Sequence, residues 1–231
     1  MDDLQKLLDE QKAYYRARAA EYDEWFERRG RYDHGEALNA QWVNEAGIAR
    51  AALHRLGPVD HAIELACGTG IWTQELAGMA KQVTALDASA EMLTINRARV
   101  DSANVTYQKV DLFEWEPVVP ADLVFMGFWL SHVPAERLAS FLFKVRRSIR
   151  TGGQVFVIDS RADQQSTAKD GTVDVDAERV QSRRLNDGRT FRIVKTYYSE
   201  SHLSSLLTQA GFRPEVFTTG RFFICAQGAA Q

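Results

Sequence analysis

From residue 61 onwards, short apolar runs alternate with segments of helical length. The runs that read as strands are AIELA (62–66), QVTALD (82–87), NVTYQKV (104–110), DLVFMGF (122–128) and QVFVIDS (154–160). The helical segments between them lie near 72–79, 89–99 and 135–149. Such an alternation forms βαβ units, in which the strands are parallel and the helices cover the sheet. With two further strand-like runs near the end of the chain, it predicts an α/β fold with a doubly wound, mostly parallel, seven-stranded Rossmann-like sheet.

The end of the chain departs from this alternation. PEVFT (214–218) and RFFICAQ (221–227) are too close together in the sequence for a helix between them. Strands joined by so short a connection pair antiparallel. We therefore expect the last strand of the sheet to be antiparallel.

The start of the chain reads as helical. One helix is expected over 3–28 and a second from Leu38 to Leu56, with glycines at 30 and 35 between them. We expect an N-terminal helical cover over 1–57 and the Rossmann-like core over 58–231.

A further segment interrupts the core after the fifth strand. Strand-like runs flank Asn186-Asp187-Gly188, and Asp-Gly in such a place is typical of a β-hairpin. We predict an inserted loop and hairpin over 161–198. Open α/β sheets bind ligands at the carboxyl ends of their strands, so the helix at 3–28 and this hairpin are natural covers for a site there.

The composition excludes several classes of protein. Basic residues number 28 and acidic residues 31, for a net charge of −3, and no basic stripe indicates a nucleic-acid partner. Two cysteines, Cys67 and Cys225, cannot form a disulfide framework or a multi-cysteine metal site, and we expect no metal. No apolar run approaches the ~20 residues of a membrane span, and the charged start MDDLQKLLDEQK is unlike a signal peptide. We expect a cytoplasmic monomer or homodimer that acts on a small molecule.

The turn after the first strand, in IELACGTGIW (63–72), narrows the choice of ligand. Gly68 and Gly70 suit a nucleotide loop, but Thr73 stands where a nicotinamide-binding loop has its third glycine. No lysine lies near this turn to bind a triphosphate, and the negative charge of Glu64 would repel a triphosphate. A carboxylate suits a ligand that offers cations or hydroxyls. S-adenosylmethionine has both, with an α-amino group, a sulfonium and ribose hydroxyls, and no phosphate.

At this turn the sequence resembles the class I S-adenosylmethionine-dependent methyltransferases, in particular the small-molecule branch with the ubiquinone and menaquinone methyltransferases. Their first motif stands here as Glu64-Leu-Ala-Cys67-Gly68-Thr69-Gly70. The resemblance extends over roughly residues 10 to 228 and implies the same cofactor. It implies cofactor contacts for Asp87 with the ribose hydroxyls and for Asp111 with the adenine amino group. The other contacts that it implies near the turn and strand ends are Leu65, Ala66, Ala88, Met92, Leu112, Phe113 and Phe128.

The segment YYRARAAEYDEW (14–25) resembles a helix that lies across the cofactor in this family. Tyr14, Arg18 and Tyr22 are one turn apart on one face. Arg18, or its neighbour Arg16, would pair with the methionine carboxylate, and a solvated arginine is the alternative. Two alternatives to these cofactor contacts stay open. Asp87 could be an ordinary helix cap, and Asp111 could be a solvated aspartate of a turn.

Methyl transfer to a hydroxyl requires removal of a proton, for which a histidine is the obvious base. His132 follows the fourth strand, near the place expected for the methyl group, and His34 is the second candidate. Support of the loop is the alternative for His132. With an ordinary imidazole pKa near 6.5, activity should fall below about pH 6.5. No Asn/Asp-Pro-Pro-Tyr/Phe motif for amide or adenine amino groups follows the fourth strand, which favours oxygen.

Three alternatives remain to the transfer of a methyl group to a hydroxyl oxygen. The chain could methylate nitrogen or carbon of a small molecule. It could bind S-adenosylmethionine without catalysis, as a partner protein. A nicotinamide-dependent oxidoreductase is the rival from another class, and the missing third glycine disfavours it.

Overall fold

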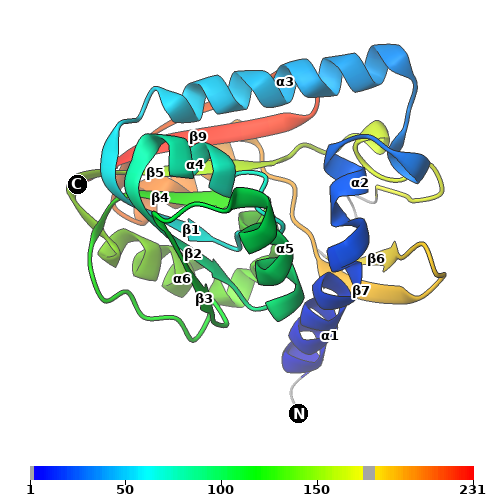
Figure 1. The fold of residues 1–231 in the computed structure, drawn as a ribbon, viewed down its shortest axis with the longest axis horizontal. Helices are drawn as coiled ribbons and strands as arrows, with labels where there is room; N and C mark the ends of the chain where they lie inside the picture. The colour runs from blue at the N-terminus through cyan, green and yellow to red at the C-terminus, as the bar shows by residue number, and fades with distance from the viewer. Residues whose placement is uncertain (1–2, 174–179) are drawn as a thin grey trace.

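A computed structural model describes residues 3–173 and 180–231 of the chain. Its centre is a seven-stranded sheet in the order β3-β2-β1-β4-β5-β9-β8 (Figure 1). The strands are β1 (Val59–Leu65), β2 (Ala80–Asp87), β3 (Val105–Lys109), β4 (Ala121–Gly127), β5 (Ile149–Ser160), β8 (Phe212–Thr218) and β9 (Phe223–Ala230). The first five are parallel, and β9 lies antiparallel between β5 and β8. This confirms the predicted fold class, including the antiparallel last strand.

Helices cover both faces of the sheet. They are α1 (Asp3–Arg18), α2 (Tyr22–Phe26), α3 (Glu36–His54), α4 (Thr73–Met79), α5 (Ala90–Val100), α6 (Ala135–Arg147) and α7 (Glu200–Gln209). The single helix expected over 3–28 is interrupted by a 3₁₀ turn at Ala19–Glu21. The turn redirects the chain, so that α1 lies beside the sheet while Trp25 and Phe26 of α2 are buried in the core. Across residues 3–173 and 180–231, no helix combines the length and the hydropathy that a membrane span requires.

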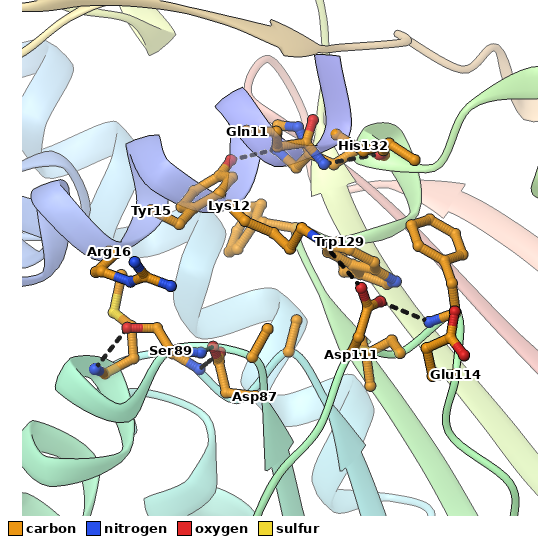
Figure 2. A pocket seen from close by; sticks show the side chains of 18 of the residues that line it. Gln11, Lys12, Tyr15, Arg16, Asp87, Ser89, Asp111, Glu114, Trp129 and His132 are labelled. Carbon is orange, nitrogen blue, oxygen red and sulfur yellow. Dashed lines mark hydrogen bonds and ion pairs between the residues drawn. The ribbon is translucent and has the colours of Figure 1, made fainter. Parts of the chain in front are cut away.

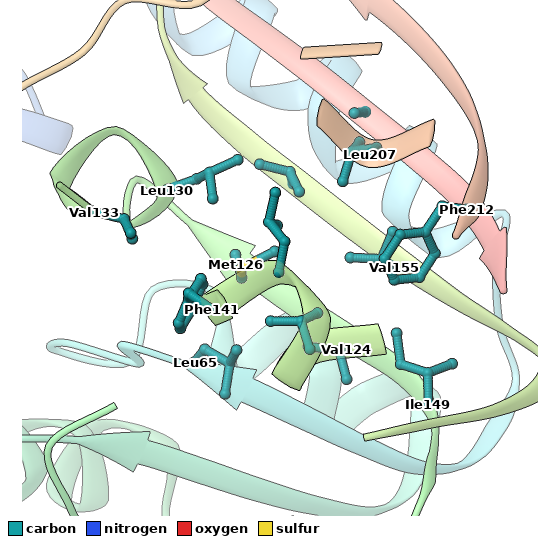
Figure 3. Close-up of a cluster of buried hydrophobic side chains, with 14 of the residues drawn as sticks. Leu65, Val124, Met126, Leu130, Val133, Phe141, Ile149, Val155, Leu207 and Phe212 are labelled. Carbon is teal, nitrogen blue, oxygen red and sulfur yellow. The ribbon is translucent and has the colours of Figure 1, made fainter. Parts of the chain in front are cut away.

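The two largest hydrophobic clusters of the core lie on opposite faces of the sheet. Along β4, Val124 and Met126 belong to one cluster and Leu123 and Phe125 to the other, as the two-residue period of a strand requires. The first cluster lies under α6 and α7 (Figure 3). The second lies under α3 and α4, and Trp42 of α3 is completely buried in it. Helix α3 is thus packed on the sheet itself.

The predicted hairpin is present as β6 (Val180–Arg184) and β7 (Thr190–Val194), paired antiparallel in a sheet of their own. Of the inserted segment predicted at 161–198, residues 174–179 lie outside the described residues. The hairpin packs on α1: the buried ring of Tyr14 contacts Leu185 and Ile193. Figure 1 shows α1 and the hairpin side by side at one edge of the molecule. We call α1 together with β6 and β7 the cover.

Candidate active site

The turn after β1 is held by one buried amide. Gly70 has φ +94°, and a Cβ there would lie 2.7 Å from Oδ1 of Asn96. The Asn96 side-chain nitrogen donates to the carbonyls of Cys67 and Gly68, at 3.2 Å each, and to Oγ1 of Thr73 at 2.8 Å. Asn96, from α5, therefore fixes the curvature of the turn, and Gly70 leaves room for it.

Thr73 explains why this turn lacks a third glycine. Its hydroxyl donates to Oε2 of Glu64 at 2.6 Å, so the start of α4 is tied to the end of β1. Glu64 is buried, and burial raises its pKa to about 8. It lines a small cavity of about 20 Å³ that reaches Gly68 and Phe128. An ammonium group bound there would favour the ionised carboxylate, so Glu64 suits the α-amino group of S-adenosylmethionine.

A larger cavity of about 220 Å³ adjoins it at the carboxyl ends of β1 to β4 (Figure 2). Asp87, at the end of β2, accepts hydrogen bonds from the backbone N–H of Gly68 at 2.9 Å and of Ser89 at 2.8 Å, one on each oxygen. A carboxylate offers about four lone-pair sites, so both oxygens can accept further bonds from vicinal hydroxyls. The cap of α5 is Ser89, whose hydroxyl accepts from the N–H of Met92.

The other end of this cavity is lined by apolar and aromatic groups. Asp111 accepts from the N–H of Phe113 at 2.9 Å and from Nζ of Lys12 at 3.3 Å. The rings of Phe113 and Trp129 lie 5.9 Å apart. With the buried side chains of Leu112 and Met92, they form walls of a shape and polarity that fit a purine base.

The structure brings most of the predicted cofactor residues together. The predicted residues that line the large cavity are Tyr22, Ala66, Gly68, Asp87, Ala88, Met92, Asp111, Leu112, Phe113 and Phe128. Glu64 lines the adjoining small cavity. Leu65 is instead fully buried in β1, and Gly70 lies under the turn against Asn96.

A second cavity of about 70 Å³ lies between the cover and the end of β5. It contains Tyr14 and Arg18, which the sequence had suggested for the cofactor. Arg16 lines the cofactor cavity instead. The two cavities share Tyr15, Tyr22, Phe128 and His132.

His34, the second candidate for the base, does not line these cavities. Nε2 of His34 is 2.9 Å from the carbonyl oxygen of Thr167, and His34 lines none of the three cavities.

Sequence reasoning missed several of the site residues that lie in or beside the cover. Lys12 and Tyr15 follow Leu8 along one face of α1, a spacing that reads as an ordinary amphipathic helix. Arg183 and Lys195 come from the inserted hairpin and the residue after it. Only their position beside Asn186-Asp187-Gly188 could have drawn attention to them.

His132 lies at the junction of the two cavities, with both ring nitrogens engaged. Nδ1 is 2.6 Å from the carbonyl oxygen of Val194, which can only accept, so this nitrogen carries the proton. Nε2 therefore accepts from the hydroxyl of Tyr15 at 2.8 Å (Figure 2). Burial, together with the positive charge of Lys195, lowers the pKa of His132 to about 3. The imidazole is neutral near pH 6.5, so the expected loss of activity below that pH does not follow from its titration.

This low pKa predicts a pH dependence of stability. The unfolded chain binds one more proton than the folded chain between about pH 3 and 6.5 at this residue, so the free energy of unfolding falls as the pH falls through that range. Going from about pH 7 to about pH 5, the stability advantage of the wild type over His132→Asn should shrink by ~2 kcal/mol. Urea unfolding at both pH values measures this difference. Other titrating groups cancel in it, and a constant difference would show that folding leaves the histidine pKa near 6.5.

The comparisons with known proteins agree with this geometry. A sequence model described as a methyltransferase domain matches residues 62–153. Among curated relatives, trans-aconitate 2-methyltransferase of Azoarcus sp. (strain BH72) is 36% identical over 110 residues, 46% of this chain and 42% of the relative. Demethylmenaquinone methyltransferase of Bacillus licheniformis is 31% identical over 108 residues, 43% and 44% of the two chains. The match thus spans less than half the length of these curated relatives.

A solved structure matches almost the whole chain. The DhpI–SAH complex is 36% identical, covers 97% of both chains and has a TM-score of 0.77. The DhpI–SAM–HEP complex gives the same identity and score over 96% of this chain. The chain belongs to the class I S-adenosylmethionine-dependent methyltransferases. This confirms the enzyme class and the cofactor, S-adenosylmethionine, that the turn after β1 had indicated, and the residues of this methyltransferase around Glu64 and Asp87 fit that cofactor.

Proposed function

We propose that the chain transfers a methyl group from S-adenosylmethionine to an oxygen atom of a small-molecule acceptor. The observation that carries this proposal is the meeting of two cavities at Tyr15, Phe128 and His132. The larger cavity fits the cofactor, and the smaller one has room for a compact acceptor. When bound, the cofactor supplies an electrophilic methyl group, and the protein aligns the acceptor with it and excludes water.

The charge of the second cavity favours oxygen over nitrogen. Its lining includes Arg18, Arg183 and Lys195, which would repel a protonated amine. Among the relatives, the one named for trans-aconitate acts on a molecule whose heteroatoms are all oxygen.

Tyr15 and His132 have a positioning role in this proposal. The imidazole, fixed by Val194, orients the Tyr15 hydroxyl at the junction. With its lowered pKa, His132 is a weak proton acceptor, so it contributes less to the removal of a proton than an imidazole of ordinary pKa would.

Ligand-dependent melting provides the first test. S-adenosylmethionine and S-adenosylhomocysteine should each raise the Tm, because they bind the native state. At a ligand concentration of a hundred times Kd, the free energy of unfolding should increase by ~2.7 kcal/mol. NADH should leave the Tm unchanged. Incubation with a panel of small oxygen and nitrogen acceptors should then yield S-adenosylhomocysteine only with the oxygen acceptors. Methylation restricted to amines would contradict the proposal, and a Tm shift with NADH alone would contradict the cofactor.

A further inference from the structure

The second cavity has an unbalanced positive charge. Of the described residues that line it, Arg18, Arg183 and Lys195 are cationic and none is an aspartate or glutamate. The buried carboxylate of Asp159 lies beneath them and pairs with Lys195 at 2.9 Å. Three cations and one carboxylate leave the cavity with a net charge of about +2, in a setting where burial strengthens electrostatic interactions.

Arg18 is the most enclosed of the three cations. Its side chain is 9% exposed, and its guanidinium lies among the rings of Tyr14, Tyr22 and Tyr32, with centroids 5.5, 4.9 and 5.8 Å away. It donates one long hydrogen bond, of 3.4 Å, to the Tyr32 hydroxyl. No carboxylate of the described residues forms an ion pair with it. A buried guanidinium without an anionic partner is costly, and a bound anion would offset that cost.

Lys195 and Arg183 retain donors for a ligand. The Lys195 ammonium donates to Asp159 and, at 2.8 Å, to Oγ of Ser131, which leaves one of its three N–H groups. Arg183 donates to the side chain of Gln181 at 2.6 Å and, weakly, to the Ser182 carbonyl. Within the described part of the chain it forms no ion pair. Both residues therefore present unused N–H groups to the same cavity as Arg18.

We propose that the methyl acceptor is a small oxyanion, a carboxylate, phosphate or phosphonate, held by Arg18, Arg183 and Lys195, and that its anionic oxygen is the nucleophile. This inference rests on the proposed function. An O–CH₃ bond forms as the S–CH₃ bond breaks, the bonding electron pair stays on sulfur, and a neutral thioether and a methyl ester result. The acceptor loses one negative charge and the cofactor its positive charge, with no proton transferred. The weak basicity of His132 accords with such a step.

Binding is tested on the full chain saturated with S-adenosylhomocysteine, by isothermal titration calorimetry. The probes are inorganic phosphate, methylphosphonate and acetate, with acetamide as the neutral counterpart of acetate. At least one oxyanion should bind, acetamide should not, and Arg183→Gln should weaken binding by about tenfold or more through loss of a charge-assisted bond. The matched control is Arg184→Gln, the exposed neighbour on β6, which should bind within about twofold of the wild type.

The affinity for S-adenosylhomocysteine should be equal in the two variants and the wild type, which shows that each is folded. Loss of cofactor binding in the wild type itself would overturn the proposed function. Cofactor binding without any oxyanion binding would overturn this inference alone, as would equal effects of the two substitutions.

The acceptor class is then read from the product. Methyl-labelled S-adenosylmethionine is offered with dicarboxylates, alkylphosphonates and alkyl phosphates, each beside its neutral alcohol. A carboxylate ester releases labelled methanol in mild alkali, whereas a phosphonate or phosphate monoester does not, so the label distinguishes the sources. Methylation of a neutral alcohol with no ester from any oxyanion would overturn the assignment of the nucleophile.

Discussion

Asp87→Ala should weaken the binding of S-adenosylhomocysteine by at least about 10²-fold. The carboxylate has a free lone pair on each oxygen after its bonds to the N–H groups of Gly68 and Ser89. Two charge-assisted bonds to the ribose hydroxyls contribute ~1.5–3 kcal/mol each, and 1.4 kcal/mol corresponds to tenfold in Kd. Calorimetric titration of the purified variant measures the effect, with circular dichroism to establish that it is folded.

Two further variants make the result specific. Asp60→Ala removes an exposed carboxylate at the start of β1 that pairs with Lys81, and it should leave the Kd unchanged. Asp87→Asn keeps the size of the side chain but turns one acceptor into a donor, so we expect it to bind nearly as poorly as Asp87→Ala. Normal affinity in a folded Asp87→Ala variant would contradict the assignment of Asp87 to the ribose.

The largest effect on stability is expected for Gly70→Ala. The new methyl group would lie 2.7 Å from Oδ1 of Asn96 and 3.2 Å from its Cα, at a φ of +94° that alanine rarely adopts. Backbone strain of ~1–2 kcal/mol and overpacking of ~1–3 kcal/mol give a loss of roughly 2–5 kcal/mol. Differential scanning calorimetry should show a Tm lower by roughly 4–20 °C.

The matched control is Gly78→Ala, in helix α4, where a Cβ meets nothing within 4 Å. Alanine is the better helix former there, so the free energy of unfolding should increase by up to about 1 kcal/mol. The Tm should accordingly stay the same or rise slightly. A Gly70→Ala variant as stable as this control would show that Asn96 moves away without cost.

The sequence could predict the parts of the site that follow from the strands. Gly68, Asp87 and Asp111 each lie at or just after the end of a run that reads as a strand. Parallel strands bring their carboxyl ends to one edge, so the meeting of these residues needs no knowledge of side-chain packing. The position of α1 could not be obtained in this way. The 3₁₀ turn at Ala19–Glu21 follows no glycine or proline, and it ends α1 directly after Arg18, which lines the second cavity.

The hairpin shows the same limit. Asn186-Asp187-Gly188 predicts its turn, but its packing on α1 depends on contacts between segments more than 160 residues apart, such as the bond from the Arg192 N–H to Oε1 of Glu10. No local pattern in the sequence encodes such a pairing. The sequence therefore shows the positive charges of Arg183 and Lys195, but it could not predict that both residues line the second cavity.

Gln11 of α1 connects the cover to the loop after β4. Its side-chain nitrogen donates to the carbonyl of His132 at 3.2 Å, and its oxygen accepts from the N–H of Val194 at 2.9 Å. These two hydrogen bonds join α1, the hairpin and the loop after β4 at one point, and both cavities lie beside it. We therefore expect that a movement of the cover which breaks these two bonds opens both cavities at once, so that S-adenosylhomocysteine and the methylated product leave together.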